Sequence, residues 1–546
     1  MTSLTDKLRI FLEENNADAL LVNSTNEFLV EYNQLENNSR YILTGFSGST
    51  GEALVTKEKI YLFIDGRYHE QADLEVDHDL VNVIKLQIGT SYIKELLNCL
   101  KQDSKLLVVA SKISNTFLSA ISKEMDDKNI EIMPINFDPV FNFSCKKETS
   151  KPQKIINVPA EISGLTADEK FEDLIKDIGK NEVLIITSLE DVAYFSNIRS
   201  FSIPYSSSFY GKLIITHNGG TLYSDNDISY IGNFYEIELL EQFEADLRKI
   251  SNKTVLIDKK SITAKDYSLI NNSNRIKESS HSQIKTIKNE FEINHFKESF
   301  RRADEALLVV QNMLQSNKIY SELDIYKELE KSFYEKGAKS LSFKPIVAAG
   351  KNSSIIHYSN PQNTVFVNEG DFLLVDCGGY YEGGYATDIT RTFIKGTPSD
   401  LHKKVYTTVL KAFLNAFNHT YINGSTWFDI DGIARNTINE SGLDDFSFNH
   451  STGHGVGISV HESPPFVASA EISKTPIYKN AVFTIEPGIY KPAWGGVRLE
   501  NTVFIKDIND NVTIETLSKF KFDMNIVDFS LLNKEEKSWL EEWQEL

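Results

Sequence analysis

The sequence predicts a chain of three domains, in which two related α/β domains precede a larger α+β domain. The length of 546 residues exceeds what one hydrophobic core usually supports. Residues 18–72 and 181–216 repeat one order of elements, an apolar strand, a polar loop and a second strand. From residue 343 onward, strand-like segments alternate with glycine-rich turns. These three observations define the fold class.

The first predicted domain spans residues 1–156. Its first half reads as strand, turn-rich loop, strand and helix start, in the segments "ADALLVNS", "RYILTGFSGSTGEALVT" and "KIYLFIDGRYHEQA". The glycines of "GFSGSTG" lack the lysine and hydroxyl residue that end a phosphate-binding P-loop, so we interpret them as a structural turn. The domain ends in the polar stretch "SCKKETSKPQKIINVP", which is typical of a linker.

The second predicted domain spans residues 157–283, and the third spans residues 284–546. The second repeats the strand pattern in "NEVLIITSLEDVAYFSNIRSFSIPYSSSFYGKLIIT", with an acidic helical turn after the first strand. The third opens with a long helix, because its apolar residues recur at mostly helical spacing. These residues are Phe291, Ile293, Phe296, Phe300, Ala303 and Leu307.

Composition and charge narrow the class of protein. With 41% hydrophobic and 25% charged residues, the chain resembles an ordinary globular protein, and no stretch approaches about 18 consecutive apolar residues. The net charge of −20 argues against a broad nucleic-acid surface. Cys99, Cys145 and Cys377 are too few for a disulfide framework and are expected to be buried apolar residues. We therefore expect a cytoplasmic protein without nucleic-acid or membrane partners.

Two aspartates in "VDCGGYYEGGYATDITRT" are the first candidate site residues. Asp376 and Asp388 are each flanked by valine or isoleucine, so both carboxylates are expected in partly buried strands. An unpaired buried charge is costly, which predicts a neutralising partner. Taken alone, however, such a pair is more often found as turn residues or solvated hairpin charges.

Three further residues complete an oxygen-rich set. His454 lies in "HSTGHGVGISVHESP", Glu486 in "FTIEPGIY" and Glu500 in "GVRLEN", each on or beside a segment with strand character. With one imidazole and no thiolate, the set favours harder divalent ions such as manganese or cobalt over a structural zinc site. Four carboxylates carry about four negative charges, which two divalent cations would balance.

These motifs, in this order, resemble the metallopeptidase family with the pita-bread fold, which includes methionine aminopeptidase, prolidase and aminopeptidase P. The three-domain aminopeptidases P are the most similar branch, because "DGRYHEQA", "LEDVAYFSNIRS" and the closing "LLNKEEKSWLEEWQ" resemble their first domain, second domain and C-terminal helix. The resemblance implies two creatinase-like N-terminal domains followed by a pita-bread catalytic domain with a C-terminal extension. It also implies a homodimer.

The same resemblance implies a dinuclear metal site. By it, two metal ions are bound by Asp376, Asp388, His454, Glu486 and Glu500. Asp388 and Glu500 would bridge the ions, for which manganese is favoured, with cobalt and zinc as alternatives. Family members usually separate the two aspartates by eleven positions, whereas here they are twelve apart. We expect the additional residue in the "GGYYEGGY" turn or in a bulge, because one extra residue in a regular strand would turn one carboxylate away.

Histidines and one arginine are the candidate substrate-binding residues. His461, seven positions after His454, and His357 in "IIHY" match family residues that contact the substrate carbonyl, and His450 is a third candidate. A lone histidine on a strand is more often structural, and here the motif outweighs that interpretation. Arg498 should share a strand face with Glu500, where a salt bridge would orient acidic ligands.

The expected function is that of a dinuclear metal aminopeptidase that releases the first residue from peptides with proline at position 2. The predicted catalytic residues are His357, His461 and Glu486, the last as the proton shuttle. Tyr358 and Phe343 are candidates for a proline pocket. A prolidase acting on Xaa-Pro dipeptides is the alternative enzyme, and a noncatalytic pita-bread peptide-binding or chaperone module is the alternative from another class.

Overall fold

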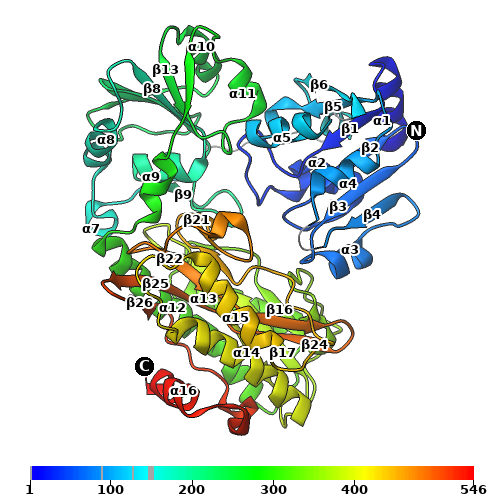
Figure 1. The fold of residues 1–546 in the computed structure, drawn as a ribbon, viewed down its shortest axis with the longest axis vertical. Helices are drawn as coiled ribbons and strands as arrows, with labels where there is room; N and C mark the ends of the chain where they lie inside the picture. Colours follow the sequence, from blue (N-terminus) through cyan, green and yellow to red (C-terminus); the bar gives the residue numbers. More distant parts are fainter. Residues whose placement is uncertain (1–2, 88–89, 126–127, 145–152, 546) are drawn as a thin grey trace. The chain divides into compact units, whose positions relative to one another are not determined.

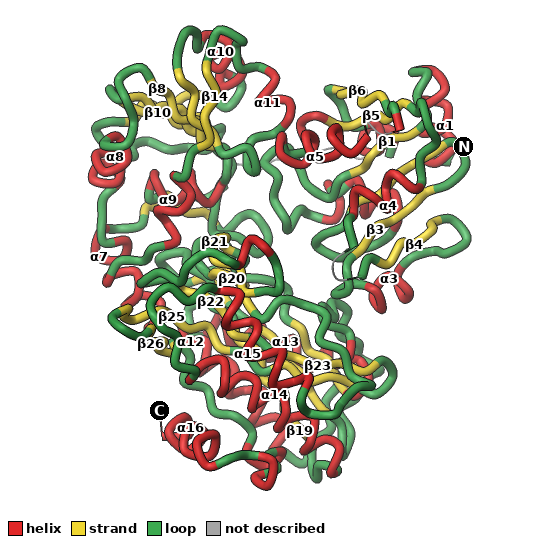
Figure 2. Tube along the Cα trace, viewed as in Figure 1, coloured by secondary structure: helices red, strands yellow, loops and turns green. Residues whose placement is uncertain are grey.

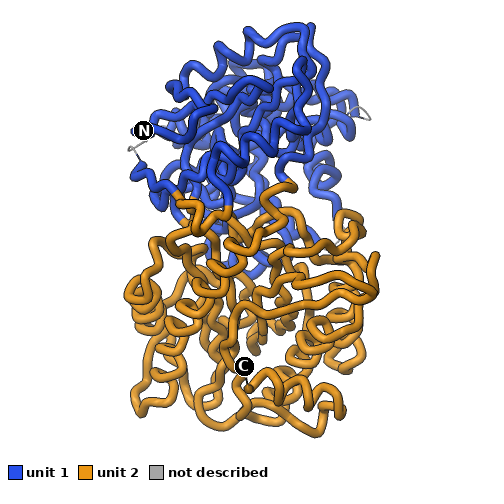
Figure 3. The backbone as a smooth tube through the Cα atoms, turned by 90° about the vertical axis from the view of Figure 1, so that its left-hand side faces the viewer, with its two compact units in different colours: residues 1–157, 165–204, 208–282 blue, residues 158–164, 205–207, 283–546 orange. Residues whose placement is uncertain are grey.

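The computed structural model describes residues 3–87, 90–125, 128–144 and 153–545. The chain forms two compact units, one made of residues 1–157, 165–204 and 208–282 and the other of residues 158–164, 205–207 and 283–546 (Figure 3). The boundary predicted at residue 156 falls in strand β7 (Ile155–Asn157), and that at residue 283 falls in a 3₁₀ helix. The three-domain boundaries stay a prediction.

The first unit contains two six-stranded sheets, each flanked by helices (Figure 2). The first sheet has the order β4-β3-β2-β1-β5-β6. Its strands are β1 (Ala19–Val22), β2 (Glu52–Thr56), β3 (Ile60–Ile64), β4 (Val81–Lys85), β5 (Lys105–Val109) and β6 (Glu131–Ile135). The second sheet has the order β12-β11-β10-β8-β13-β14. Its strands are β8 (Glu182–Ile186), β10 (Lys212–Thr216), β11 (Gly219–Tyr223), β12 (Tyr235–Glu238), β13 (Thr254–Ile257) and β14 (Arg275–Glu278).

The two sheets share one topology. In each, the first strand in the chain pairs antiparallel with the second, the second pairs antiparallel with the third, and all remaining pairs are parallel. This correspondence confirms the two related α/β domains expected from the sequence repeat. A short two-stranded sheet of β7 and β9 (Ile198–Ser200) completes the strands of this unit.

Apart from the first, the helices of the first unit lie between its strands in the order of the chain. Helix α1 (Leu4–Glu14) begins at a capping box between Ser3 and Asp6, which satisfies the free N–H groups of its first turn. The remaining helices are α2 (Ser39–Thr44), α3 (His69–Glu75), α4 (Tyr92–Asn98), α5 (Asn115–Met125), α6 (Pro139–Phe143), α8 (Ala167–Ile175), α9 (Leu189–Ser196), α10 (Gln242–Lys249) and α11 (Ala264–Ser268). Helix α9 is the acidic helical segment that the sequence predicted.

Cys377 is buried and Cys99 partly buried, while Cys145 lies outside the described residues.

The predicted long helix of the second unit is α12 (Glu290–Gln315). Asn289 and Glu292 form a capping box at its start. The apolar face is buried as expected, except that Phe291, in the first turn, is 53% exposed. The other helices are α7 (Ala160–Ser163), α13 (Glu322–Glu335), α14 (Asp400–Asn418), α15 (Trp427–Asn439) and α16 (Lys534–Glu545), the last being the predicted closing helix. None of the helices in the described part of the chain combines the length and apolar character needed to cross a bilayer.

Strands of the second unit form a three-stranded sheet β16-β17-β19, a five-stranded sheet β21-β20-β22-β25-β26 and the pairs β15-β18 and β23-β24. Their bounds are β15 (Ser340–Leu341), β16 (Ile346–Ala349), β17 (Phe372–Cys377), β18 (Gly379–Tyr380), β19 (Ile389–Ile394), β20 (Gly453–Gly455), β21 (Glu462–Val467), β22 (Val482–Ile485), β23 (Gly488–Lys491), β24 (Gly495–Arg498), β25 (Asn501–Ile508) and β26 (Val512–Thr516). Helices α12 and α13 bury one core against β16, β17 and β19, and α14 and α15 bury a second against β22 and β25 (Figure 1). Asp376 alternates along β17 with Leu373, Val375 and Cys377 of the first core, so it points to the opposite face of the sheet.

Candidate metal centre

The hairpin of β17 and β19 places both predicted aspartates on one face. Asp376 lies opposite Thr390, and the same register continues to the bridge between Tyr380 and Ala386. Residues opposite each other in an antiparallel pair point to the same side, and so do residues two positions apart in a strand. Asp388 therefore shares the face of Thr390 and Asp376. The twelve-residue spacing is accommodated by a uniform register that ends in a short turn at the tip.

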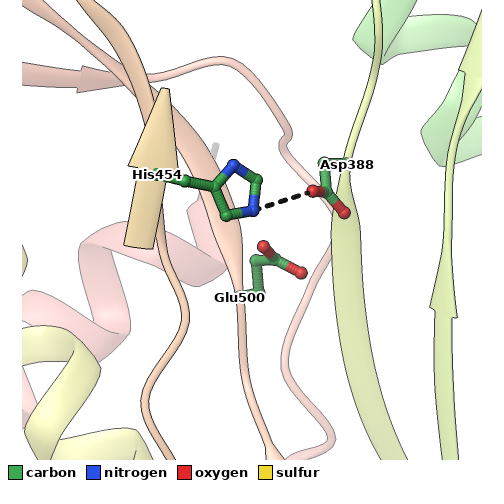
Figure 4. Close-up of side chains that lie close together, drawn as sticks. All are labelled: Asp388, His454 and Glu500. Atoms are coloured by element: carbon green, nitrogen blue, oxygen red, sulfur yellow. Dashed lines mark ion pairs between the residues drawn. The ribbon is translucent and has the colours of Figure 1, made fainter. Parts of the chain in front are cut away.

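Three side chains from three segments converge at the centre of the site (Figure 4). One ligand atom from each of Asp388, His454 and Glu500 lies within 4.8 Å of the others. The Nε2 atom of His454 is 3.6 Å from Oδ2 of Asp388. The Thr390 hydroxyl donates a 2.7 Å hydrogen bond to Oε2 of Glu500 and so fixes one oxygen of this carboxylate. The arrangement brings together a pair of oxygens and a nitrogen that could ligate one ion.

The other two predicted ligands border this group. Glu486 places Oε1 at 3.5 Å from Nε2 of His454, and its backbone N–H donates to the Thr452 carbonyl at 2.8 Å. Asp376 accepts a 2.7 Å hydrogen bond from Arg498 at Oδ2, whereas its Oδ1 atom is buried and has no hydrogen-bond partner among the described residues. A buried carboxylate oxygen without a donor is expensive, so a cation beside Asp376 would supply the missing interaction.

Burial and mutual repulsion make Asp388, Glu500 and Glu486 hard to ionise. Burial raises the pKa of Asp388 well above its usual value, and the charges of Glu500, Asp376 and Glu486 raise it further. Burial and the neighbouring charges of Glu486 and Asp376 likewise raise the pKa of Glu500, and burial raises the pKa of Glu486 to about 7. The residues thus fit divalent cations, since bound cations would remove the repulsion and provide the donor set with its counter-charge.

Arg498, which the sequence had suggested, is a buried cation of this network. Its guanidinium is nearly inaccessible and pairs with Asp376, as predicted for a salt bridge that orients an acidic ligand. Nη1 also donates to the Tyr490 hydroxyl at 2.8 Å, and Nε donates to the Thr390 hydroxyl at 3.1 Å. Arg498, at the end of β24, therefore links β17 and β19 of the hairpin to Tyr490 in β23.

Two of the three candidate histidines, His461 and His450, border the same cluster. The ring of His461 packs edge-on against His454, with centroids 4.6 Å apart. His450 is buried, forms a 2.9 Å hydrogen bond with the Tyr490 hydroxyl and places Nδ1 at 3.9 Å from Oε2 of Glu486. His357 is partly buried and follows Ile356, whose carbonyl accepts a 3.4 Å hydrogen bond from Arg498. Their roles toward a substrate stay a prediction.

The two aromatic candidates for a proline pocket differ. Tyr358 is buried, and its hydroxyl donates a hydrogen bond to Glu322. This hydroxyl is therefore engaged and does not line a proline pocket. Phe343 is partly buried.

Sequence reasoning missed Thr390 and Tyr490. Thr390 had a detectable signal, since it lies two residues after Asp388 in an apparent strand and so shares its face.

Comparisons with known proteins match most of the chain. The model of metallopeptidase family M24 matches residues 294–507, and creatinase/prolidase N-terminal domains match residues 5–137 and 146–292. The chain is 27% identical over 575 residues to the protein named Probable Xaa-Pro aminopeptidase P of Laccaria bicolor, covering 98% of this chain and 88% of that protein. For the protein of the same name from Aspergillus fumigatus, identity is 28% over 580 residues, with the same coverage.

Solved structures show the same fold. The X-prolyl aminopeptidase of Caenorhabditis elegans, a cytosolic enzyme with a di-nuclear active site, superposes with a TM-score of 0.90 at 24% identity and covers 96% of this chain and 90% of its own. An Xaa-Pro dipeptidase from Bacillus anthracis has a TM-score of 0.55 at 28% identity and covers 66% of this chain and 99% of its own.

Two α/β domains followed by a domain with a buried group of carboxylates and histidine define a metallopeptidase of the pita-bread fold. The family models and the relatives matched over nearly the full length identify the family. The chain belongs to metallopeptidase family M24 and carries two creatinase-type N-terminal domains.

Proposed function

We propose that this metallopeptidase is an aminopeptidase that hydrolyses the bond between the first residue of a peptide and a proline at position 2. The observation that carries the proposal is the buried convergence of Asp388, His454 and Glu500, with Glu486 and Asp376 beside them. Relatives whose alignments cover 98% of this chain are named Probable Xaa-Pro aminopeptidase P, which supports the choice of substrate.

We assign two divalent metal ions to the site, with Mn²⁺ favoured and Co²⁺ or Zn²⁺ as alternatives. Asp376, Asp388, His454, Glu486 and Glu500 would hold them, with Asp388 and Glu500 bridging. When bound, such ions lower the pKa of water and act as Lewis acids toward a peptide carbonyl. The oxygen-rich donor set and the di-nuclear site of the Caenorhabditis elegans enzyme support this assignment.

One of the proposed ligands and the side chains beside them would perform the proton transfers and bind the substrate. We assign the proton shuttle to Glu486, which would accept a proton from water and return it to the departing prolyl nitrogen. His461 and His357 would donate hydrogen bonds to the scissile carbonyl as negative charge develops on it. Arg498 pairs with Asp376 and orients its carboxylate, and His450 places Nδ1 at 3.9 Å from Oε2 of Glu486.

Two alternatives are less well supported. A prolidase would act on Xaa-Pro dipeptides alone. The match to the Bacillus anthracis dipeptidase covers only 66% of this chain, whereas the match to the Laccaria bicolor Xaa-Pro aminopeptidase P covers 98%. A noncatalytic module would have no need for a full ligand set. All five candidate ligands are present here.

Location and assembly complete the proposal. We place the enzyme in the cytoplasm, in line with the cytosolic enzyme of the same fold, and we expect a homodimer that acts on small peptides. Nucleic acid and membranes are not among the proposed partners, in keeping with the net charge of −20.

Peptides of different length test the proposed reaction. The protein loaded with Mn²⁺ is incubated with an Xaa-Pro dipeptide, an Xaa-Pro-Yaa tripeptide and a longer Xaa-Pro peptide, and release of the first residue is measured. We expect rapid cleavage of the tripeptide and the longer peptide, and slow cleavage of a matched peptide with alanine at position 2. Cleavage of the dipeptide alone would identify a prolidase, and no cleavage with full metal loading would favour the noncatalytic module.

A further inference from the structure

A buried glutamate outside the metal centre accepts an unusual number of hydrogen bonds. Glu322 lies in the first turn of α13, its side chain is inaccessible to solvent, and no ion pair to it occurs in the described part of the chain. Oε1 accepts from the Ala349 N–H at 2.8 Å and from the Asn352 amide at 2.9 Å. Oε2 accepts from the Tyr358 hydroxyl at 2.7 Å and from the Gln362 N–H at 3.2 Å.

All four donors belong to one connecting segment, residues 349–362, which runs from the end of β16 toward β17. This segment carries His357. On its other side, Arg498 donates to the carbonyl of Ile356, and Ile355, Ile356 and Tyr358 pack with Tyr490 in one buried cluster. Glu322 and Arg498 thus hold the segment from two directions, immediately before and after His357.

The cost of burying this carboxylate indicates what it does. A buried charge without a cation is unfavourable, and burial accordingly raises the pKa of Glu322 while the four hydrogen bonds lower it. An apolar residue at this position would avoid the cost but would leave the N–H groups of Ala349 and Gln362 without an acceptor. The carboxylate has four acceptor positions, which match the four donors of the segment.

We propose that Glu322 is a positioning residue that fixes residues 349–362 and thereby sets where the His357 ring meets the peptide. The inference rests on the proposed function and extends it to a residue remote from the metal ligands. Glu322 acts through His357 and contacts neither metal nor substrate. A misplacement of about 1 Å in a group that contacts the reacting atoms can cost about 100-fold in rate.

Replacement by glutamine alters only part of this network. The amide oxygen can still accept two bonds, and the Tyr358 hydroxyl can rotate to accept instead of donate. The Gln362 N–H, however, would then face an amide N–H. We expect Glu322→Gln to lower kcat/KM about 10-fold, as for a lost buried hydrogen bond, and Glu322→Ala about 100-fold. Tyr358→Phe removes one donor and should give a smaller loss, which keeps the test open if Glu322→Ala does not fold.

A double-mutant cycle with His357→Ala separates positioning from general destabilisation. If Glu322 acts through His357, Glu322→Gln should change kcat/KM less than about 2-fold in the His357→Ala background. Metal content per chain should be the same in all variants. Glu536→Gln is the control outside this segment, since Glu536 is a buried glutamate in the first turn of α16 that accepts from Asn533 and Asn415 and pairs with Lys411. Its effect should be the same in both backgrounds.

The outcomes distinguish this inference from the proposed function. An equal loss from Glu322→Gln with and without His357, or full activity of the Glu322→Gln and Tyr358→Phe variants, would overturn the role of Glu322 while the enzyme itself remained active. A metal-loaded wild-type protein that does not cleave Xaa-Pro peptides would contradict the proposed function, and with it the need for a positioned His357.

Discussion

The acidic site should make the metal-free protein less stable as the pH rises from 5 to 8. Each raised pKa means that the folded state holds a proton that the unfolded state has already released. Between the unfolded and folded pKa values, ΔG of unfolding therefore falls with increasing pH. For Glu486 alone, the rise from 4.5 to about 7 corresponds to about 3 kcal/mol, and Asp388 and Glu500 act in the same direction.

Thermal unfolding of the chelated protein measures this effect. About 3 kcal/mol should lower the unfolding midpoint of the catalytic unit by about 6–12 °C between pH 5 and pH 8. Addition of Mn²⁺ should raise the midpoint most at pH 8, because the ligands must be deprotonated to bind. Asp304, whose pKa burial raises to about 6, adds to the slope. Glu486→Gln isolates the share of Glu486, and it should make the slope of the metal-free protein shallower.

The result that would refute this reasoning is specific. A chelated protein whose midpoint is constant or rises from pH 5 to pH 8, with the same slope in Glu486→Gln, would mean that these carboxylates are ionised without cost. In that case the site would not need cations, and the electrostatic argument for two ions would fail.

Three further predictions concern individual site residues. Asp388→Ala or Glu500→Ala should lose bound metal and activity together, and a full complement of two ions in either variant, measured by elemental analysis, would exclude the bridging assignment. His461→Ala should keep its metal but lose about 10²–10³ in turnover; an empty site there, with metal retained in His454→Ala, would exchange the two assignments. Deletion of Gly384 at the hairpin tip should retain metal and substantial activity, and loss of metal from a folded deletion variant would show that this residue is integral to the register.

The candidate ligands were accessible from the sequence because each sits in a short local motif. Asp376, Asp388, His454, Glu486 and Glu500 are flanked by glycines or apolar strand residues, and the order of these motifs along the chain identifies them together. The repeated α/β domains were likewise visible as two similar runs of apolar strands. In both cases each motif or strand is a short run of consecutive residues.

Other parts of the network left no local signal. Three of the four donors to Glu322 lie at least 30 residues after it in the chain, and two of the four are backbone N–H groups, which every non-proline residue carries. The exposure of Phe291 could not be read from spacing either, because a first-turn residue can fit the helical period and still lie beyond the packed core. Such features depend on how distant segments meet in the folded chain.

Titration of the metal-free protein with Mn²⁺ tests the central claim most directly. Bound manganese per chain and the initial rate of cleavage of an Xaa-Pro-Yaa tripeptide are measured on the same samples. The account predicts that activity depends on added metal and reaches its plateau at two ions per chain, with neither binding nor activity in Asp388→Ala. Full activity in the thoroughly chelated protein, or a plateau with no metal bound at these residues, would contradict it.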